Sequence, residues 1–164
     1  MDKATINNQT TAVITSTELL HHWQAHRSLT RRVIEAFPEK ELFEYAIGGM
    51  RPFAAMVQEL LAIAGPGIRQ IASGGTEELN EKIDQANSKA NILALWDAAT
   101  TAINQYWALI PDEKFHDTIL AFGQYEGTVW SSIFYYIDNE IHHRAQAFVY
   151  LRSLGIEPPY FWQR

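Results

Sequence analysis

The sequence predicts an all-α fold, a four-helix bundle, from three observations. Apolar residues recur at helical spacing over four long segments, and no convincing run alternates with period two. Helix-capping residues stand where these segments begin. A polar, turn-rich stretch over 73–86 separates the second segment from the third. We therefore expect an up-down four-helix bundle with one long, crossover-like connection between its second and third helices.

A first long helix and a short one are expected near the N-terminus. Thr15, followed by Glu18 three residues later, has the pattern of a capping box and opens a helix over about 17–36. A turn and a short helical piece are expected over 39–45. The glycine pair at 48–49 then breaks the helical pattern.

The second long helix is expected to begin at Arg51-Pro52 and to run to about Ala64. Proline suits the first turn of a helix because its missing N–H costs little there. The Gly-Pro-Gly run at 65–67 should end or kink this helix.

The last two long helices have clear start signals. Asn87 or Ser88 caps a helix that reaches about Leu109. After a loop that contains two glycines, Thr128 caps the last helix, which extends to Leu154. Gly155 then occupies the position where left-handed backbone geometry is wanted.

Length and composition describe one ordinary globular domain. The 164 residues are 47% hydrophobic and 20% charged, so we expect a single domain over 1–164 with 1–16 as a flexible N-terminal arm. The formal net charge of −6 argues against a nucleic-acid partner. Because the chain has no cysteine, a metal ion would need histidine, carboxylate, amide or water ligands.

No segment reaches the roughly 18 consecutive apolar residues of a membrane span. The polar residues 1–17 also lack the basic-then-apolar order of a signal peptide. We therefore expect a soluble cytoplasmic protein with no membrane partner. Patterns for phosphate, dinucleotide or calcium binding and for a nucleophilic serine are absent from the sequence.

The last helix carries a stripe of polar and aromatic residues that is the strongest candidate for chemistry. Residues four apart share a helix face, so Asn139 and His143 point the same way. Facing the bundle interior, the stripe would need partners such as a metal ion. Facing solvent, it would be a polar surface near the helix end, where basic groups suit the helix dipole. The stripe consists of Tyr136, Asn139, His143, Gln146 and Tyr150.

Two further sets of side chains have the chemistry of metal ligands. Glu59 stands in a mostly apolar helix and is a competent ligand, although an exposed carboxylate is the commoner fate of glutamate. His22 and His26 are four residues apart, but no acidic residue of the HExxH type stands between them. A surface pair is therefore the favoured interpretation of these two histidines.

Two blocks of the sequence resemble the DinB/YfiT-like family of bacterial four-helix-bundle proteins. The more specific block is 137–159, IDNEIHHRAQAFVYLRSLGIEPP, which is similar to the family's last helix ending in HHRxQ, then YLRxxG and a PP turn. The second block is 49–64, GMRPFAAMVQELLAIA, which is similar to the family's second helix. The likeness follows the helix order over most of the chain.

The resemblance implies a metal site with an altered ligand set. In the family, a histidine on the second helix and an HxxxH pair on the fourth bind a divalent metal, and these positions fall on Glu59, Asn139 and His143. Carboxylate for imidazole is a plausible exchange, whereas an amide oxygen is a poor zinc ligand. We expect these three side chains to converge inside the bundle around a zinc or nickel ion. The pocket residues expected beside them are Tyr136, His142, Arg144 and Gln146.

The resemblance leaves two functions open. The first is a divalent-metal-dependent transferase or isomerase acting with a low-molecular-weight thiol, which the metal would activate as thiolate. The second is a non-catalytic binding or interaction protein that keeps the bundle and a small-molecule pocket but has lost the metal. Family habit and the large apolar groups near the chain ends also predict a homodimer. The aromatic residues expected at its interface are Trp96, Trp107, Tyr160, Phe161 and Trp162.

Overall fold

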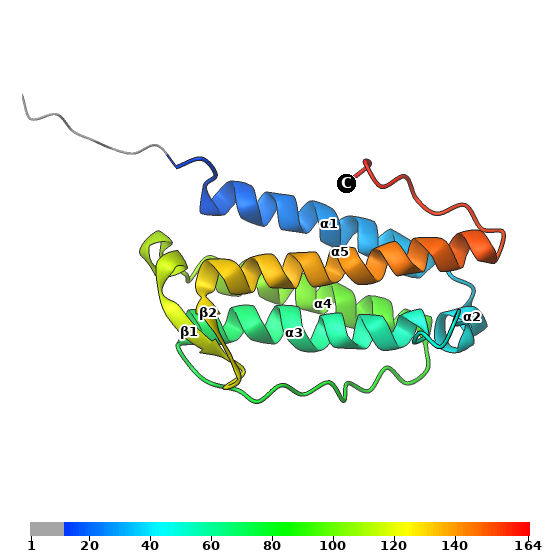
Figure 1. Cartoon of the computed structure of the whole chain (residues 1–164), viewed down its shortest axis with the longest axis horizontal. Coiled ribbons are helices and arrows are strands. Elements are labelled where there is room, and N and C mark those ends of the chain that lie inside the picture. The colour runs from blue at the N-terminus through cyan, green and yellow to red at the C-terminus, as the bar shows by residue number, and fades with distance from the viewer. Residues whose placement is uncertain (1–11) are drawn as a thin grey trace, which may run out of the picture.

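The computed structural model describes residues 12–164, which form a helical bundle with one small β-hairpin. The long helices lie side by side, and the hairpin lies at the end where the last helix begins (Figure 1). The predicted four-helix bundle is thus confirmed, and the hairpin is an addition to it. The long helices are α1 (Ser16–Ala36), α3 (Phe53–Ser73), α4 (Lys89–Trp107) and α5 (Val129–Ser153). The short elements are α2 (Glu39–Glu44), the 3-10 helix η1 (Asp112–His116), β1 (Thr118–Ala121) and β2 (Tyr125–Thr128).

Most of the N-terminal arm predicted over 1–16 lies outside the described residues. Within the described part, Thr15 caps α1, and Thr15 and Glu18 form the expected capping box. Ser88 and Thr128 cap α4 and α5, each accepting a hydrogen bond from a backbone N–H of the first turn. None of the helices in residues 12–164 is long and apolar enough to span a membrane.

The long connection over 74–88 sets the direction of the helices. It runs back along the bundle beside α3 (Figure 1), so that α3 and α4 point the same way. Cross-contacts agree with this arrangement: Arg27 and Arg31 of α1 bond to Thr100 and Asp97 of α4, so α1 and α4 are antiparallel. The expected crossover is present, but because it makes α3 and α4 parallel the helix order is up-down-down-up, and the expectation of an up-down order is wrong.

The second long helix was predicted to end or kink near Ala64, and the predicted end is wrong. Helix α3 continues through Pro66 to Ser73. An internal proline costs about 3 kcal/mol through the lost hydrogen bond and steric clash. The continuation buries Ile68 and Ile71 in the core. Apolar burial of this kind offsets the local preference of proline.

Strands β1 and β2 pair antiparallel from Thr118–Thr128 to Ala121–Tyr125. Their turn places Phe122 and Gly123 in the left-handed backbone region, with φ values of 54° and 70°. A phenylalanine is rare in that conformation. The sequence therefore lacks the usual signal of a hairpin turn, a pair of Asn, Asp or Gly residues at these positions. The Phe122 side chain is buried, and its backbone N–H donates to the Gln70 side chain of α3. Tertiary contacts therefore hold this turn.

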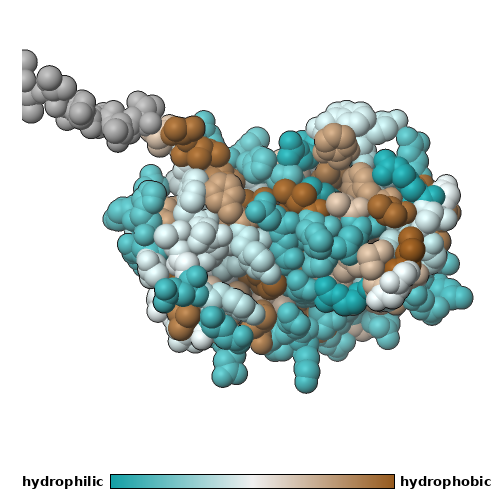
Figure 2. All heavy atoms as spheres, viewed as in Figure 1, coloured by the Kyte–Doolittle hydropathy of each residue, from teal (hydrophilic) through white to brown (hydrophobic). Residues whose placement is uncertain are grey.

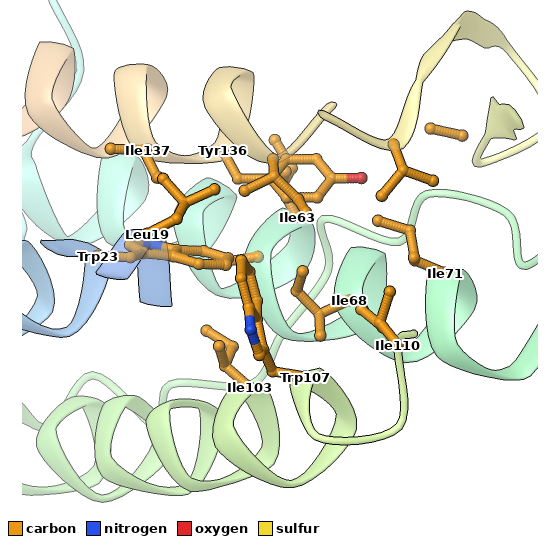
Figure 3. Close-up of a cluster of buried hydrophobic side chains, with 14 of the residues drawn as sticks. Leu19, Trp23, Ile63, Ile68, Ile71, Ile103, Trp107, Ile110, Tyr136 and Ile137 are labelled. Carbon is orange, nitrogen blue, oxygen red and sulfur yellow. The ribbon is translucent and has the colours of Figure 1, made fainter. Parts of the chain in front are cut away.

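The core lies between the long helices, and on the face shown in Figure 2 only small, separate hydrophobic patches reach the surface. Trp23 and Trp107 pack edge to face in the core, close to Tyr136 of α5 (Figure 3). Trp107 and Trp96 are only 6% and 1% exposed. Their expected place at a dimer interface is therefore wrong, because both belong to the core of the monomer.

Candidate functional site

Glu59 of α3 and Asn139 and His143 of α5 come together, as the sequence predicted. The Asn139 amide nitrogen donates to Glu59 Oε1 over 3.2 Å. His143 Nε2 lies 3.2 Å from the same oxygen. One turn of α5 separates the two partners, so a single carboxylate on the facing helix contacts both. We call these three residues the Glu59 cluster.

Arg51, just before α3, completes the surroundings of Glu59. Its guanidinium donates to Glu59 Oε2 over 2.6 Å. The Arg51 carbonyl accepts a hydrogen bond from the hydroxyl of Tyr150, which fixes this segment against α5. The Arg51 side chain is half exposed, whereas Glu59 is largely shielded from solvent. Both oxygens of Glu59 therefore have partners, and its charge is balanced by Arg51.

The protonation states follow from these contacts. Burial raises the pKa of Glu59, but hydrogen bonds from Arg51, His143 and Asn139 outweigh it, so the pKa is lowered. Burial lowers the pKa of His143, and the nearby Glu59 only partly opposes this. At neutral pH Glu59 is thus ionised and His143 is neutral, with Nε2–H donating to the carboxylate. The other ring nitrogen of His143 is buried and has no hydrogen-bond partner among residues 12–164.

The Glu59 cluster fits the family's metal site poorly. Donor atoms that share one ion through bonds of about 2.0–2.2 Å lie roughly 3 to 3.5 Å apart, so the two 3.2 Å separations alone suit either an ion or hydrogen bonds. The donor set contains a single imidazole and an amide, which is weak for zinc. The guanidinium of Arg51 beside Glu59 would also repel a cation. Within the described part of the chain, no three His, Asp or Glu side chains are grouped to hold a metal ion.

The surroundings of His143 are a second reason why the Glu59 cluster fits a metal ion poorly. A metal-bound histidine almost always donates its second ring N–H to a carboxylate, carbonyl or water. The corresponding nitrogen of His143 is buried with no such protein partner within residues 12–164. The support that normally orients a ligating imidazole is therefore missing from the protein side of this site.

The four predicted pocket residues lie in different places. Tyr136 is in the core against Gly67, and its buried hydroxyl has no hydrogen-bond partner among the described residues. His142 bonds to Gln146 on the exposed side of α5, although its ring is in edge contact with His143. Arg144 faces α1 and not α3. None of the four forms a hydrogen bond with the Glu59 cluster in the described structure.

A pocket of about 290 Å³ begins at Glu59 and extends toward the hairpin. It lies between α3, the connection over 74–88, strand β2 and the first turns of α5. Sequence analysis missed it because the hairpin was expected to be a loop and the connection was not placed against α3. The pocket is lined by Glu59, Ile63, Leu79, Glu81, Ala121, Phe122, Tyr125, Glu126, Gly127, Ser131, Ser132 and Tyr135.

The adjacent face of α5, which packs against α1, carries a second polar cluster that the sequence did not reveal. Glu140 is 1% exposed and lies 3.6 Å from the guanidinium groups of both Arg27 and Arg144. Thr30 donates to Glu140 Oε1 over 2.6 Å, and the indole N–H of Trp23 points to the other oxygen. We call Glu140, Arg27, Arg144 and Thr30 the Glu140 cluster.

Arg27 and Glu140 stay paired despite their burial. Burial lowers the pKa of Arg27 to about 10, which leaves the guanidinium charged at neutral pH. The same burial raises the pKa of Glu140, and both arginines act against that rise. Arg27 also stacks over the ring of Trp96 at 3.9 Å and donates to Thr100. All of these partners come from the bundle itself.

The interpretation of His22 and His26 as a surface pair is correct for His22 only. His26 is buried, and its Nδ1 accepts a hydrogen bond from Arg144 over 2.8 Å. Its Nε2 lies 3.1 Å from the exposed His22 ring. His26, on α1, is thus attached to the Glu140 cluster and not to the Glu59 cluster.

The fold and this site together define a class of helical-bundle proteins with a polar cluster between the second and last long helices. The chain belongs to the DinB family, which matches residues 7–163. None of the curated proteins compared with the chain matches it.

Solved structures share the fold, and two of them are DinB-like proteins. A DinB-like protein from Bacillus cereus ATCC 10987 superimposes with a TM-score of 0.71 at 16% identity, covering 88% of this chain and 95% of that one. A DinB-like protein from Bacillus subtilis gives a TM-score of 0.70 at 18% identity, covering 89% of this chain and 99% of that one. At these identities the likeness extends to the fold alone.

Proposed function

We propose that this DinB-family protein is a small-molecule-binding protein that works without a metal ion at the Glu59 cluster. The observation that carries the proposal is the position of Glu59. Its carboxylate lines the pocket, and its charge and hydrogen-bonding capacity are matched by Arg51, Asn139 and His143. A carboxylate held in this way can serve as a fixed polar group for a ligand.

The form of the pocket supports this function. Small-molecule sites are concave and mostly apolar, contain a few oriented polar groups, and have volumes of about 300–1,000 Å³. The pocket is at the lower end of that range, and its lining includes the apolar side chains of Ile63, Leu79 and Phe122. If the bundle were purely structural, a pocket lined by an ionised carboxylate would have no function.

A second candidate function is the divalent-metal-dependent thiol-cofactor transferase, with zinc or nickel and a low-molecular-weight thiol. The observation that favours it is the convergence of Glu59, Asn139 and His143 at separations that one ion could share. In addition, His143 is neutral at physiological pH, as a metal ligand must be. The chemistry of the donor set and the position of Arg51 place this candidate second.

Metal titration of protein prepared without a histidine tag separates the two candidates. We expect substoichiometric zinc and nickel after purification and only weak binding by calorimetry. Stoichiometric metal that is lost in His143→Ala would overturn the proposal and favour the transferase.

The Asn139→His variant provides the matched positive control. It restores two imidazoles on one face of α5, so its affinity for zinc or nickel should exceed that of the parent and should fall at acidic pH. The gain should disappear in the double variant Asn139→His/His143→Ala. Equal affinities in parent and Asn139→His would mean that residue 139 does not face a metal position.

A further inference from the structure

We propose that the ligand of this pocket is an organic cation, a primary amine carried on a short apolar or aromatic body. This inference rests on the proposed binding function and adds the chemical class of the ligand.

The charged groups of the pocket are all carboxylates. Glu59, Glu81 and Glu126 line it, and no lysine or arginine does. Arg51 balances Glu59, whereas Glu81 and Glu126 form no ion pair within residues 12–164. The rim of the pocket therefore carries two exposed glutamates without ion-pair partners in the described structure, beside an apolar floor.

The wall that carries Glu81 is attached to the bundle. The Gln58 side chain of α3 donates to the Glu81 carbonyl, and Arg69 of α3 pairs with Glu77 of the same connection. Glu126 belongs to β2, whose register with β1 is defined by backbone pairing. Both carboxylates thus come from segments with fixed positions relative to α3 and α5.

Two tyrosines supply aromatic faces at the mouth of the pocket. Tyr125 and Tyr135 are 57% and 55% exposed, so a ligand could reach both rings from solvent. Burial raises the pKa of Tyr135, and the charges of Glu59 and Glu81 raise it further, so its hydroxyl stays neutral near these carboxylates. An ammonium group gains from the face of a tyrosine as well as from a carboxylate. An aromatic wall with adjacent carboxylates is therefore suited to an alkylammonium group.

Other ligand classes suit the pocket less well. An anion, such as a phosphate or a thiolate, would meet carboxylates with no free cation in the lining. A neutral ligand would gain no charge attraction from Glu81 and Glu126. The volume of about 290 Å³ admits a ligand of about ten non-hydrogen atoms, at roughly 30 Å³ for each water-sized group.

Three probes of nearly equal size and different charge test the inference on the full chain. They are 2-phenylethylamine, 2-phenylethanol and 3-phenylpropanoate, titrated by protein-observed NMR at low and high salt. We expect the amine to bind with an affinity about tenfold or more above that of the alcohol, with shifts at the pocket residues and weakening by salt. The carboxylate probe should bind most weakly.

Charge-neutral variants then locate the effect. Glu81→Gln and Glu126→Gln keep the shape of each side chain, and each should weaken amine binding by up to about fivefold, the range of a partly exposed ion pair. The double variant should bind amine and alcohol almost equally. Glu113→Gln in η1 is the matched control, an exposed glutamate outside the pocket, and should bind as the parent does.

The outcomes separate this inference from the proposed function. Equal or tighter binding of the alcohol or the carboxylate at the pocket would overturn the amine assignment and leave a metal-independent pocket in place. Amine preference that survives in the double variant, or the absence of binding by any probe, would also overturn it. Stoichiometric metal lost in His143→Ala would overturn the proposed function, whatever the probes show.

Discussion

The Glu59 and Glu140 clusters pack at two faces of α5 and differ in how far they are closed to solvent. Asn139 and His143 face α3, while their sequence neighbours Glu140 and Arg144 face α1. The Glu140 cluster is closed, and bundle side chains surround its carboxylate. The Glu59 cluster borders a pocket and is balanced in part by the half-exposed Arg51.

The difference shows how one helix can carry structural and functional polar groups at adjacent positions. Breaking a buried ion pair leaves an uncompensated charge and is strongly destabilising. Partly exposed pairs contribute little to stability because water replaces the lost partner. The Glu140 cluster should therefore act mainly on the free energy of unfolding, and the Glu59 cluster mainly on binding.

The largest effect is expected for Arg27→Met. This change removes one guanidinium from buried Glu140 and ends the bond to Thr100. We expect the free energy of unfolding in urea to fall by about 3–5 kcal/mol. Arg31→Met, one turn along α1, breaks only exposed pairs and should cost less than about 1 kcal/mol. Equal losses in the two variants would contradict the distinction between closed and open clusters.

The contact of α3 with α5 at Gly67, about two turns along α3 from Glu59, gives the next effect. A Cβ atom at Gly67 would lie 2.6 Å from the ring of Tyr136, so Gly67→Ala must push the ring or the helices apart. We expect a loss of about 1–3 kcal/mol in thermal or urea unfolding. Gly65→Ala meets only Ala99 at 3.8 Å and should be neutral or stabilising. A Gly67→Ala protein as stable as Gly65→Ala would show that the two helices are not held at this spacing.

Acid should weaken the Glu140 side of the molecule through His26. Burial, followed by the charge of Arg144, lowers the pKa of His26 to about 3, below its unfolded value of 6.5. Between these values the unfolded chain binds the extra proton, so stability is complete above about pH 6.5 and falls as the pH drops toward 3. From pH 7 to 5.5 this group alone should cost about 1 kcal/mol.

The variant His26→Gln isolates that contribution. Between pH 7 and pH 5.5, the free energy of unfolding of His26→Gln in urea should fall by about 1 kcal/mol less than that of the parent. The loss that remains in the variant comes from other groups such as His143, whose pKa is also lowered. An unchanged pH dependence would mean that His26 is not held in its neutral form by the bundle.

The smallest effect on unfolding is expected from the C-terminal aromatic residues, which belong to neither cluster. Tyr160, Phe161 and Trp162 are 48%, 66% and 63% exposed, and the homodimer predicted from the sequence keeps these three as its candidate contacts. Light scattering at tens of micromolar should give a dimer mass for the parent and a monomer mass for Phe161→Ser/Trp162→Ser. A monomeric parent would contradict the prediction.

The sequence predicted features that depend on local signals. The capping residues Thr15, Ser88 and Thr128 fixed the helix starts, and the i, i+4 spacing put Asn139 and His143 on one face. The convergence with Glu59 followed from the family resemblance, since spacing within one helix says nothing about its neighbour.

The features that were missed depend on tertiary contacts. Helix α3 continues past Pro66 because its later turns are buried, and the turn at Phe122 is held by Gln70. The pairing of Glu140 with Arg27 joins residues far apart in the chain, and each looked like an ordinary charged residue of an amphipathic helix. Only the packed bundle shows which polar residues are enclosed.

The most direct test of the two-cluster account compares urea unfolding of Glu59→Gln and Glu140→Gln. In Glu59→Gln the side chain still offers an oxygen to Asn139 and His143, and the half-exposed Arg51 is solvated by water. In Glu140→Gln two buried guanidinium groups lose their counter-charge. The account predicts that Glu140→Gln loses at least about 2 kcal/mol more than Glu59→Gln. Equal losses, or a larger loss in Glu59→Gln, would contradict it.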